Sequence, residues 1–295
     1  LVVGIDREGV AAGRPNFVTT EPFAVGATCV LDEHAARHMR VLRLDSGAVV
    51  GVRDGRGQVG AGQVVRLTKT QAYVEITDVA VIAPLPEVHL LVPVADRERM
   101  LWLAEKACEL GCTSWRPVLW KRSRSVSPRG EGVAFQQKVM ARMTSALAQS
   151  EGAWLPQPFP EATLERALLA APPGDRLVLD PAGAPMVGSA AVFLREPIVL
   201  AIGPEGGIEA DELAALVAAG FRPVCLGPTI LRFETAAVAA LAIARTALGA
   251  TSTAHSPKNT FHFCHSSRHF SSFFFRYIHD AIHAFWLVNF RSIRL

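Results

Sequence analysis

Two short apolar segments, each running into a turn rich in glycine and proline, constrain the fold of this chain most. The first, residues 198–202, leads into Gly-Pro-Glu-Gly-Gly at 203–207, and a helical pattern follows as far as Gly220. The second precedes a turn at 226–228, and an alanine-rich helix is expected from about Glu234 to Leu248. In open α/β sheets, ligands bind outside the carboxyl ends of the strands. Both turns are therefore expected to face one site.

The composition of the first turn suits close approach to a ligand. Gly203, Gly206 and Gly207 allow positive φ angles and leave the backbone uncovered, and Pro204 stiffens the turn. No Gly-Lys-Ser/Thr follows, as a Walker loop would require, and the dinucleotide-binding spacing is absent. A tight connection without a ligand is the alternative for this pentapeptide taken alone.

The segment Leu-Gly-Pro-Thr-Ile-Leu-Arg-Phe-Glu-Thr-Ala at 226–236 makes the signal specific. Together with Gly-Pro-Glu-Gly-Gly it resembles the signature of the RsmE family, SPOUT-superfamily methyltransferases that act on small-subunit ribosomal RNA. The resemblance implies a deep trefoil knot that binds S-adenosylmethionine largely through backbone groups. The cofactor-binding residues that it implies are Leu179, Ile202, Gly203, Pro204, Glu205, Gly206, Gly207, Leu226, Gly227, Ile230 and Leu231.

The same resemblance, with the strand and helix pattern, predicts the fold class and the domains. An α/β methyltransferase domain of SPOUT type, with a mostly parallel sheet, is expected over 87–250. A small PUA-like β-barrel domain that binds RNA is expected over 15–82, and Ala-Pro-Leu-Pro at 83–86 is the linker. Residues 1–14 are expected to be an extension. Residues 251–295 are expected to be an atypical tail, disordered or without native function, with an RNA- or membrane-surface appendage as the alternative.

Within the first domain, valine-rich alternation predicts strands over 48–52, 58–67 and 72–79, and a helix is expected over 32–41 with Asp32 as its N-cap. Residues 38–44 resemble the start of RsmE proteins. Five arginines lie within twenty residues and are candidates for phosphate contacts: Arg37, Arg40, Arg43, Arg53 and Arg56. A solvated polar face is the alternative for these arginines. Residues 1–250 hold 25 basic against 26 acidic side chains, so any RNA binding must come from local basic patches.

In the second domain we expect strands over 88–94, 115–120 and 176–180, and helices over 96–110, 133–150 and 164–170. The last of these strands is expected to end in a turn at 180–183. Glu105 and Glu109 are expected to form an acidic face in water. A Ser/Arg-rich stretch at 116–129 is either a solvated loop or grips RNA phosphates, and Arg122 and Arg124 are its candidate contacts.

By the resemblance, the reaction moves a methyl group from S-adenosylmethionine to N3 of a uridine in 16S ribosomal RNA. Uracil N3 must lose a proton, so a base or support for the anion is needed. Glu234 is the candidate base and Arg232 the candidate anion stabiliser. The alternatives are that Glu234 caps its helix and that Arg232 pairs with Glu234. Thr229 stands where the family usually has another arginine, and Ala148 where it has an acid.

Two other functions compete with this interpretation. One is a SPOUT ribose 2′-O-methyltransferase, although the segment at 230–235 differs from the Ser-Leu-Asn-Val-Ser-like segment typical of those enzymes. The other is an RNA-binding protein without catalysis. The expected partners are 16S ribosomal RNA or the small subunit and a second copy in a homodimer, in the cytoplasm. No membrane span and no metal-ligand spacing is evident, and the cysteines are expected to be reduced thiols.

Overall fold

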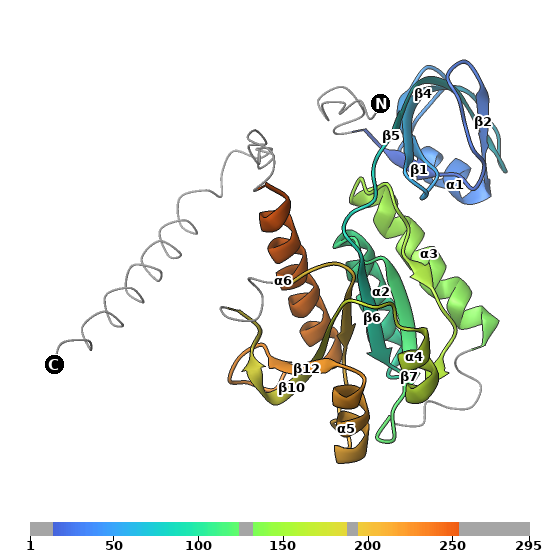
Figure 1. Cartoon of the computed structure of the whole chain (residues 1–295). Helices are drawn as coiled ribbons and strands as arrows, with labels where there is room; N and C mark the ends of the chain where they lie inside the picture. Colours follow the sequence, from blue (N-terminus) through green and yellow to red (C-terminus); the bar gives the residue numbers. More distant parts are fainter. Residues whose placement is uncertain (1–13, 124–131, 188–193, 254–295) are drawn as a thin grey trace, which may run out of the picture. The chain divides into compact units, whose positions relative to one another are not determined.

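The computed structural model describes residues 14–123, 132–187 and 194–253, with side chains as far as residue 249. The chain forms two β-sheets, one before and one after the linker at 83–86 (Figure 1). The prediction for Arg124 and those for the two ends of the chain lie outside the described residues. The domain boundaries themselves stay a prediction.

The first sheet is mixed and has the order β1-β3-β4-β5-β2. Its elements are β1 (Asn16–Val18), β2 (Thr28–Leu31), α1 (Glu33–Val41), β3 (Val49–Arg53), β4 (Gln58–Leu67) and β5 (Ala72–Val81). The three strands predicted from alternation are present, and Asp32 caps α1 by accepting a hydrogen bond from the amide of Ala35 at 2.9 Å. β1 and β2 were missed because three or four residues are too few to show a period of two.

The second sheet is parallel throughout, with the order β12-β10-β11-β6-β7-β8, and β9 also pairs with β7. Its strands are β6 (Val88–Pro93), β7 (Ser114–Leu119), β8 (Gln157–Pro158), β9 (Ala162–Thr163), β10 (Asp175–Pro185), β11 (Ile198–Ala201) and β12 (Phe221–Cys225). Its helices are α2 (Arg97–Glu109), α3 (Val133–Gln149), α4 (Leu164–Ala170), α5 (Ala210–Ala218) and α6 (Phe233–Thr253). After β11 the chain therefore crosses β10 and adds β12 on the other side of β10.

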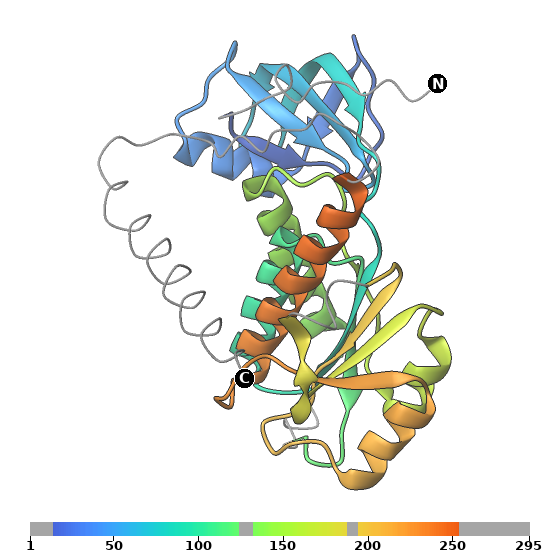
Figure 2. The ribbon, with the colours of Figure 1, turned by 60° about the vertical axis from the view of Figure 1, so that its left-hand side comes forward.

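Helices cover both faces of this sheet, so its strands are buried on two sides (Figure 2). Leu90 of β6 belongs to the core shared with α2, α3 and α6. Its neighbour Leu91 belongs to the core shared with α4 and α5, because successive side chains of a strand point to opposite faces.

The end predicted for β10 is wrong, because the strand continues to Pro185 instead of turning at 180–183. Residues 180–183 form a bulge, so that Leu179 and Ala184 both pair with Val224. The Asp180 carboxylate accepts the amide of Ala182 at 2.7 Å and closes the bulge. A Cβ at Gly183 would lie 2.4 Å from the Val224 nitrogen, so the close approach of the two backbones requires glycine.

The acidic face predicted on α2 is also not simply solvated. Lys106 donates to the carboxylates of Glu105 and Glu109 at 2.9 and 2.7 Å, and Arg142 of α3 lies 3.7 Å from Glu105. All three α2 side chains are about one-quarter to one-third exposed. The sequence pattern showed the two acidic residues, but it did not show that Lys106 between them would form an ion pair with each.

Arg245 of α6 joins the linker to the end of α2. Its guanidinium donates to the carbonyls of Pro86, Leu110 and Gly111, the second at 3.1 Å. Gly111 has a φ of +68°, as the predicted left-handed helix end requires. Burial lowers the pKa of Arg245, and the carbonyls compensate for part of the lost hydration.

Four cysteines lie in the described part of the chain and all are free. Burial raises the pKa of both Cys108 and Cys112 to about 12, so both thiols are protonated at neutral pH. A helix that could cross a membrane does not occur in the described segments.

Candidate cofactor and catalytic site

The carboxyl ends of β10, β11 and β12 meet at one edge of the second sheet. Leu179 pairs with Val224, and β11 ends at Ala201, opposite Val178. The amide of Ile202 then donates to the Leu91 carbonyl at 2.9 Å, which holds the start of the next loop beside β6. The structure thus brings Leu179, Ile202 and Leu226, all predicted from the family resemblance, to adjacent strand ends.

The loop after β11 is fixed by a turn in its middle. The amide of Gly207 donates to the Pro204 carbonyl at 2.9 Å, and Gly207 has a φ of +82°. Gly203 and Gly206 do not adopt a positive φ, so that part of the prediction is wrong for them. Gly203 is needed for a different reason, since a Cβ there would lie 2.5 Å from Cγ1 of Ile208.

The basic stretch after β7 lies against this loop and the start of α5. Arg122 donates to the Glu209 carboxylate at 2.5 Å and to the Gly206 carbonyl at 2.9 Å. The amide of Lys121 donates to Glu212 at 2.7 Å, and its ammonium pairs with Asp211. The acids in the first turn of α5, expected from the helix dipole, therefore also bind this stretch.

Arg99, in the first turn of α2, links the loop after β11 to the first turn of α6 and was missed by the sequence analysis. Its guanidinium pairs with Glu205 of the loop after β11, and its Nε lies 3.9 Å from the Glu234 carboxylate. The one available signal was its position, because α2 follows β6 and begins at the same edge of the sheet.

Glu234 is buried, with 8% of its surface exposed. Its Oε2 has no hydrogen-bond partner among the described residues, and its Oε1 faces Arg99. Among the described residues, the Glu234 side chain is bonded to no backbone amide and not to Arg232, so the structure supports neither helix capping by Glu234 nor an Arg232–Glu234 pair. Arg232 is exposed, and it begins α6 through its carbonyl, which accepts the amide of Ala236 at 2.9 Å.

The loop after β12 leaves apolar surface and open backbone beside these charges. Ile230 is 89% exposed and Leu231 is 37% exposed, while a Cβ at Gly227 would meet no atom within 4 Å. Uncovered aliphatic side chains and a free carboxylate oxygen suit a ligand with both a flat apolar part and polar groups. The residues present at this edge therefore fit a nucleoside cofactor such as S-adenosylmethionine.

Comparison with known proteins gives the family. A family model for an RNA methyltransferase domain matches residues 83–245, and one for an RNA methyltransferase PUA domain matches residues 31–77. A ribosomal RNA small subunit methyltransferase E from Synechocystis sp. is 33% identical over 209 residues, which cover 69% of this chain and 67% of the relative. The chain belongs to the RsmE family. The corresponding protein of Mycobacterium bovis is 29% identical over 237 residues, covering 76% of this chain and 88% of that one.

Solved structures agree with the RsmE assignment. A ribosomal RNA small subunit methyltransferase E from Neisseria gonorrhoeae, bound to S-adenosyl methionine, is 28% identical, with a TM-score of 0.72 over 79% of this chain and 97% of that chain. A putative methyltransferase from Legionella pneumophila with bound SAM is 25% identical, with a TM-score of 0.73 over 80% and 98%. The predicted fold class, a SPOUT-type α/β domain preceded by a PUA-like β domain, is confirmed. The knot stays a prediction.

The RsmE chain uses two of its predicted phosphate-binding arginines to hold its own backbone. Arg53 is buried and donates to the carbonyls of Glu151 and Gly152 at 2.8 and 2.9 Å, and burial lowers its pKa. The phosphate role predicted for Arg53 is therefore wrong. Arg40 donates to the carbonyls of Thr68 and Lys69 in the β4–β5 turn. Arg37, Arg43 and Arg56 are exposed.

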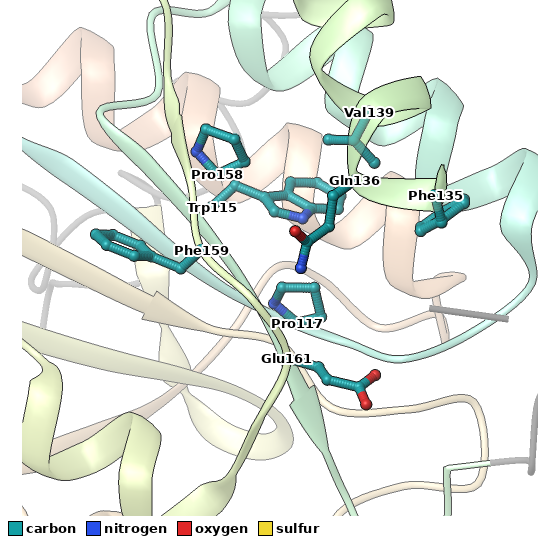
Figure 3. Close-up of a pocket in the computed structure, with 8 residues that line it drawn as sticks. All are labelled: Trp115, Pro117, Phe135, Gln136, Val139, Pro158, Phe159 and Glu161. Atoms are coloured by element: carbon teal, nitrogen blue, oxygen red, sulfur yellow. The ribbon is translucent and has the colours of Figure 1, made fainter. Parts of the chain in front are cut away.

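Two hollows of this RsmE structure lie away from the loops after β11 and β12. The smaller hollow lies between α3 and β8, the strand that contains Pro158, and Trp115 also lines it (Figure 3). The other has a volume of about 220 Å³ and lies on the α4 side of the sheet. The converging strand ends, Glu234 and the exposed Ile230 are all at the loops, and none of them lines either hollow. Within the described segments, acids, histidines and cysteines form no group suited to a metal ion.

Proposed function

We propose that this protein transfers a methyl group from S-adenosylmethionine to N3 of a uridine in 16S ribosomal RNA. The observation that carries this proposal is the meeting of two loops, 202–209 and 226–232, around a buried glutamate with a free oxygen, in a chain of the RsmE family. The relatives named ribosomal RNA small subunit methyltransferase E support the substrate class, and the neighbour bound to S-adenosyl methionine supports the cofactor.

The cofactor, when bound, supplies a methyl group on a sulfonium, which is a strong electrophile. Ile202, Leu226, Ile230 and Leu231 would enclose its apolar part, and the backbone of residues 203–207 would bind its polar groups. Gly227 leaves that approach open, because no atom lies where its side chain would be. Leu179, the last residue of β10 before the bulge at 180–183, would close the adjoining strand edge.

The proton of uracil N3 needs an acceptor before the nitrogen can attack. Glu234 Oε2 is buried and has no partner among the described residues, so it has a lone pair to offer. The Nε of Arg99 lies 3.9 Å from the other carboxylate oxygen, Oε1, and this ion pair would position the carboxylate. Arg232 carries a positive charge at the exposed start of α6, where it would stabilise the uracil anion.

RNA would be bound by exposed basic residues of both regions. Arg37 and Arg43 have exposed side chains in the first sheet region and are the proposed phosphate contacts there. Arg40 and Arg122 would contact RNA with the donors that remain after their internal hydrogen bonds. We also propose assembly as a homodimer, action on the small subunit or its RNA, and a cytoplasmic location.

The deciding experiment maps the methylated nucleoside. 16S ribosomal RNA is prepared from cells with and without this protein, digested to nucleosides and analysed by mass spectrometry. Loss of 3-methyluridine in the deletion strain, restored by the wild-type gene and not by a Glu234→Gln gene, is the expected result. A missing 2′-O-methyl nucleoside would instead show the competing ribose methyltransferase, and an unchanged set of nucleosides would contradict the proposal.

A further inference from the structure

The cavity of about 220 Å³ lies between α4 and the face of the second sheet that α4 covers. On the α4 side, the buried Ala167 and the exposed Ala170 line it, and these short side chains leave the space unfilled. On the sheet side, the polar His89 of β6 and Ser114 and Arg116 of β7 lie among the apolar Leu91 and Val199. Ser114 is buried and His89 and Arg116 are half-buried, so a few polar groups converge beside apolar surface, as in small-molecule sites.

Arg116 is the charged group of the cavity. Its guanidinium carbon lies 4.3 Å from the centre of the Phe159 ring, so the cation is stacked on an aromatic face. Burial lowers the pKa of Arg116, and no carboxylate in the described part of the chain offsets that cost. The five N–H donors of a guanidinium are therefore available to an anion from outside the protein.

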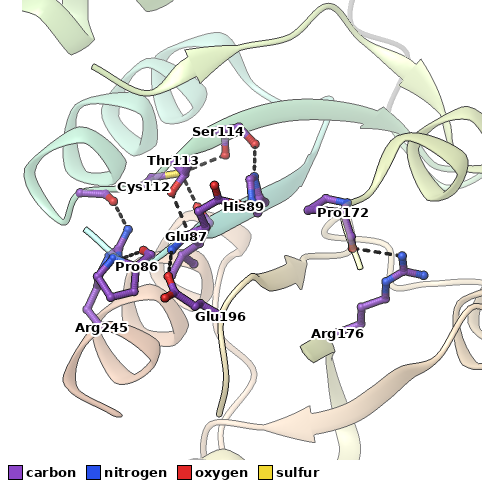
Figure 4. Close-up of polar contacts among 12 residues, drawn as sticks. Pro86, Glu87, His89, Cys112, Thr113, Ser114, Pro172, Arg176, Glu196 and Arg245 are labelled. Atoms are coloured by element: carbon purple, nitrogen blue, oxygen red, sulfur yellow. Dashed lines mark hydrogen bonds and ion pairs between the residues drawn. The ribbon is translucent and has the colours of Figure 1, made fainter. Parts of the chain in front are cut away.

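His89 and Ser114 add a defined hydrogen-bonding group beside Arg116. The ring Nδ1 of His89 is 2.8 Å from the Ser114 hydroxyl, and its Nε2 is 3.2 Å from the Glu87 carboxylate (Figure 4). Since the carboxylate can only accept, a neutral His89 donates from Nε2, and its Nδ1 accepts the Ser114 proton. The Ser114 hydroxyl then has no proton left for an oxyanion, so Arg116 is the donor that remains at this wall.

The rim of the cavity is held in place by a second arginine. Arg176 donates to the carbonyl of Pro172 at 3.1 Å (Figure 4), and also to the carbonyls of Ala171 at 3.2 Å and Ala219 at 2.7 Å. Ala171 and Pro172 line the cavity just after α4. The wall opposite Arg116 is therefore formed before any ligand arrives, which lowers the entropic cost of binding.

We propose that this cavity is a second ligand site, which binds a small oxyanion with a planar apolar body, a phosphomonoester or a carboxylate. Arg116 would bind the oxyanion, and Phe159 with the alanines of α4 would contact the apolar body. His89 and Ser114 lie at the amino ends of β6 and β7, the opposite ends of these strands from the loops that we assign to the cofactor. The site is therefore independent of the methyl-transfer site.

Calorimetric titration of the full-length protein tests the proposal with three probes. Phenyl phosphate and benzoate represent the two oxyanions, and benzyl alcohol is the neutral control. At least one oxyanion should bind with a Kd of about 1 mM or lower, and benzyl alcohol should bind at least tenfold more weakly, since hydrogen bonds to charged groups contribute about ten- to hundredfold in affinity. The oxyanion that binds identifies the class.

Three variants locate the site. Arg116→Met should weaken oxyanion binding about ten- to hundredfold, and Ala170→Leu should weaken it by filling the cavity from the α4 side while Arg116 is intact. Arg166→Met, which removes an exposed arginine of α4 outside the cavity, should bind like the wild type. All three should bind S-adenosylmethionine normally. Ala170→Leu also covers the case in which Arg116→Met does not fold.

The proposal is overturned if neither oxyanion binds the wild type at millimolar concentration. It is equally overturned if both a folded Arg116→Met and Ala170→Leu bind the probes like the wild type. A change in ribosomal RNA affinity alone, with unchanged probe binding, would assign Arg116 to RNA and also reject the small-molecule site.

Discussion

The loop after β11 and the loop after β12 lie at neighbouring strand ends, but they are held very differently. The first is bonded from two sides, by Arg122 to Gly206 and Glu209 and by Arg99 to Glu205. The second exposes Ile230, and the side chain of Arg232 is exposed as well. In the proposed site, the loop after β11 would form a fixed wall and the loop after β12 an open wall. The site would then be preorganised on one side and still admit both the cofactor and the RNA on the other.

The largest expected effect comes from adding a side chain to each wall. Gly203→Val should abolish S-adenosylmethionine binding and also lower stability, by about 1–3 kcal/mol, because the new side chain collides with Ile208. Gly227→Val should abolish binding while the melting temperature stays that of the wild type, since a Cβ there meets nothing. Calorimetry and thermal melts measure both. Equal loss of stability in the two variants would break the comparison between a fixed and an open wall.

Glu234→Gln should reduce kcat by about 10²–10⁴ if its carboxylate takes the uracil proton. Because the amide keeps the shape of the side chain, S-adenosylmethionine affinity should change little. Raising the pH should restore part of the rate, since hydroxide can then remove the proton. Single-turnover methylation of small subunits across a pH series is the measurement, and near-normal turnover at neutral pH would exclude Glu234 as the base.

Arg232→Ala should reduce kcat by about 10²–10³, with little effect on cofactor affinity, because an anion-stabilising contact exists mainly in the transition state. Arg166→Ala is the matched control, an exposed arginine on the far helix α4. A rise in the Kd for S-adenosylmethionine with kcat unchanged would instead make Arg232 part of the cofactor wall.

Arg99→Met should loosen the loop after β11 and the first turn of α6 together, since Arg99 is bonded to Glu205 and faces Glu234. We expect a several-fold weaker cofactor affinity and a tenfold or smaller loss of kcat, on the order of 1 kcal/mol for each charge-assisted contact. Adding Glu234→Gln to this variant should cost less than the product of the two single effects, because the residues are coupled. Independent effects would show that Arg99 does not position Glu234.

The smallest effects are expected in RNA binding. Arg37→Ala with Arg43→Ala should lower the slope of log affinity against log salt by about one for each lost phosphate contact. Arg122→Ala should lower it less, because its guanidinium already binds Glu209 and Gly206. Filter binding of a 16S fragment at several salt concentrations gives these slopes. If Arg122→Ala lowered the slope by a full unit, Arg122 would make a complete phosphate contact with the RNA.

The sequence predicted the two loops because their chemistry is local. A glycine turn, a following capped helix and the segment at 226–236 are each read within a dozen residues. Their meeting at one sheet edge followed from the general rule for parallel strands. The strand pattern gave most of the second sheet for the same reason.

What the sequence could not give depends on contacts between distant segments. Arg99 and Glu205 are 106 positions apart, so nothing in either neighbourhood indicates their ion pair. Arg53 looked like one of five surface arginines, yet it is buried against carbonyls about a hundred residues further along the chain. The bulge in β10 likewise depends on β12, whose backbone comes within contact distance of Gly183.

The placement of β12 beside β10 also sets an order of events during synthesis. Val224 leaves the ribosome roughly 45 residues after Leu179, its partner in the sheet. At about 5–20 residues per second, that edge of β10 waits about 2–9 seconds for its neighbour. An unpaired strand edge is a template for pairing with other chains. The nascent protein is therefore exposed to misassembly in this interval, and crowded polysomes, where identical chains emerge close together, increase that risk.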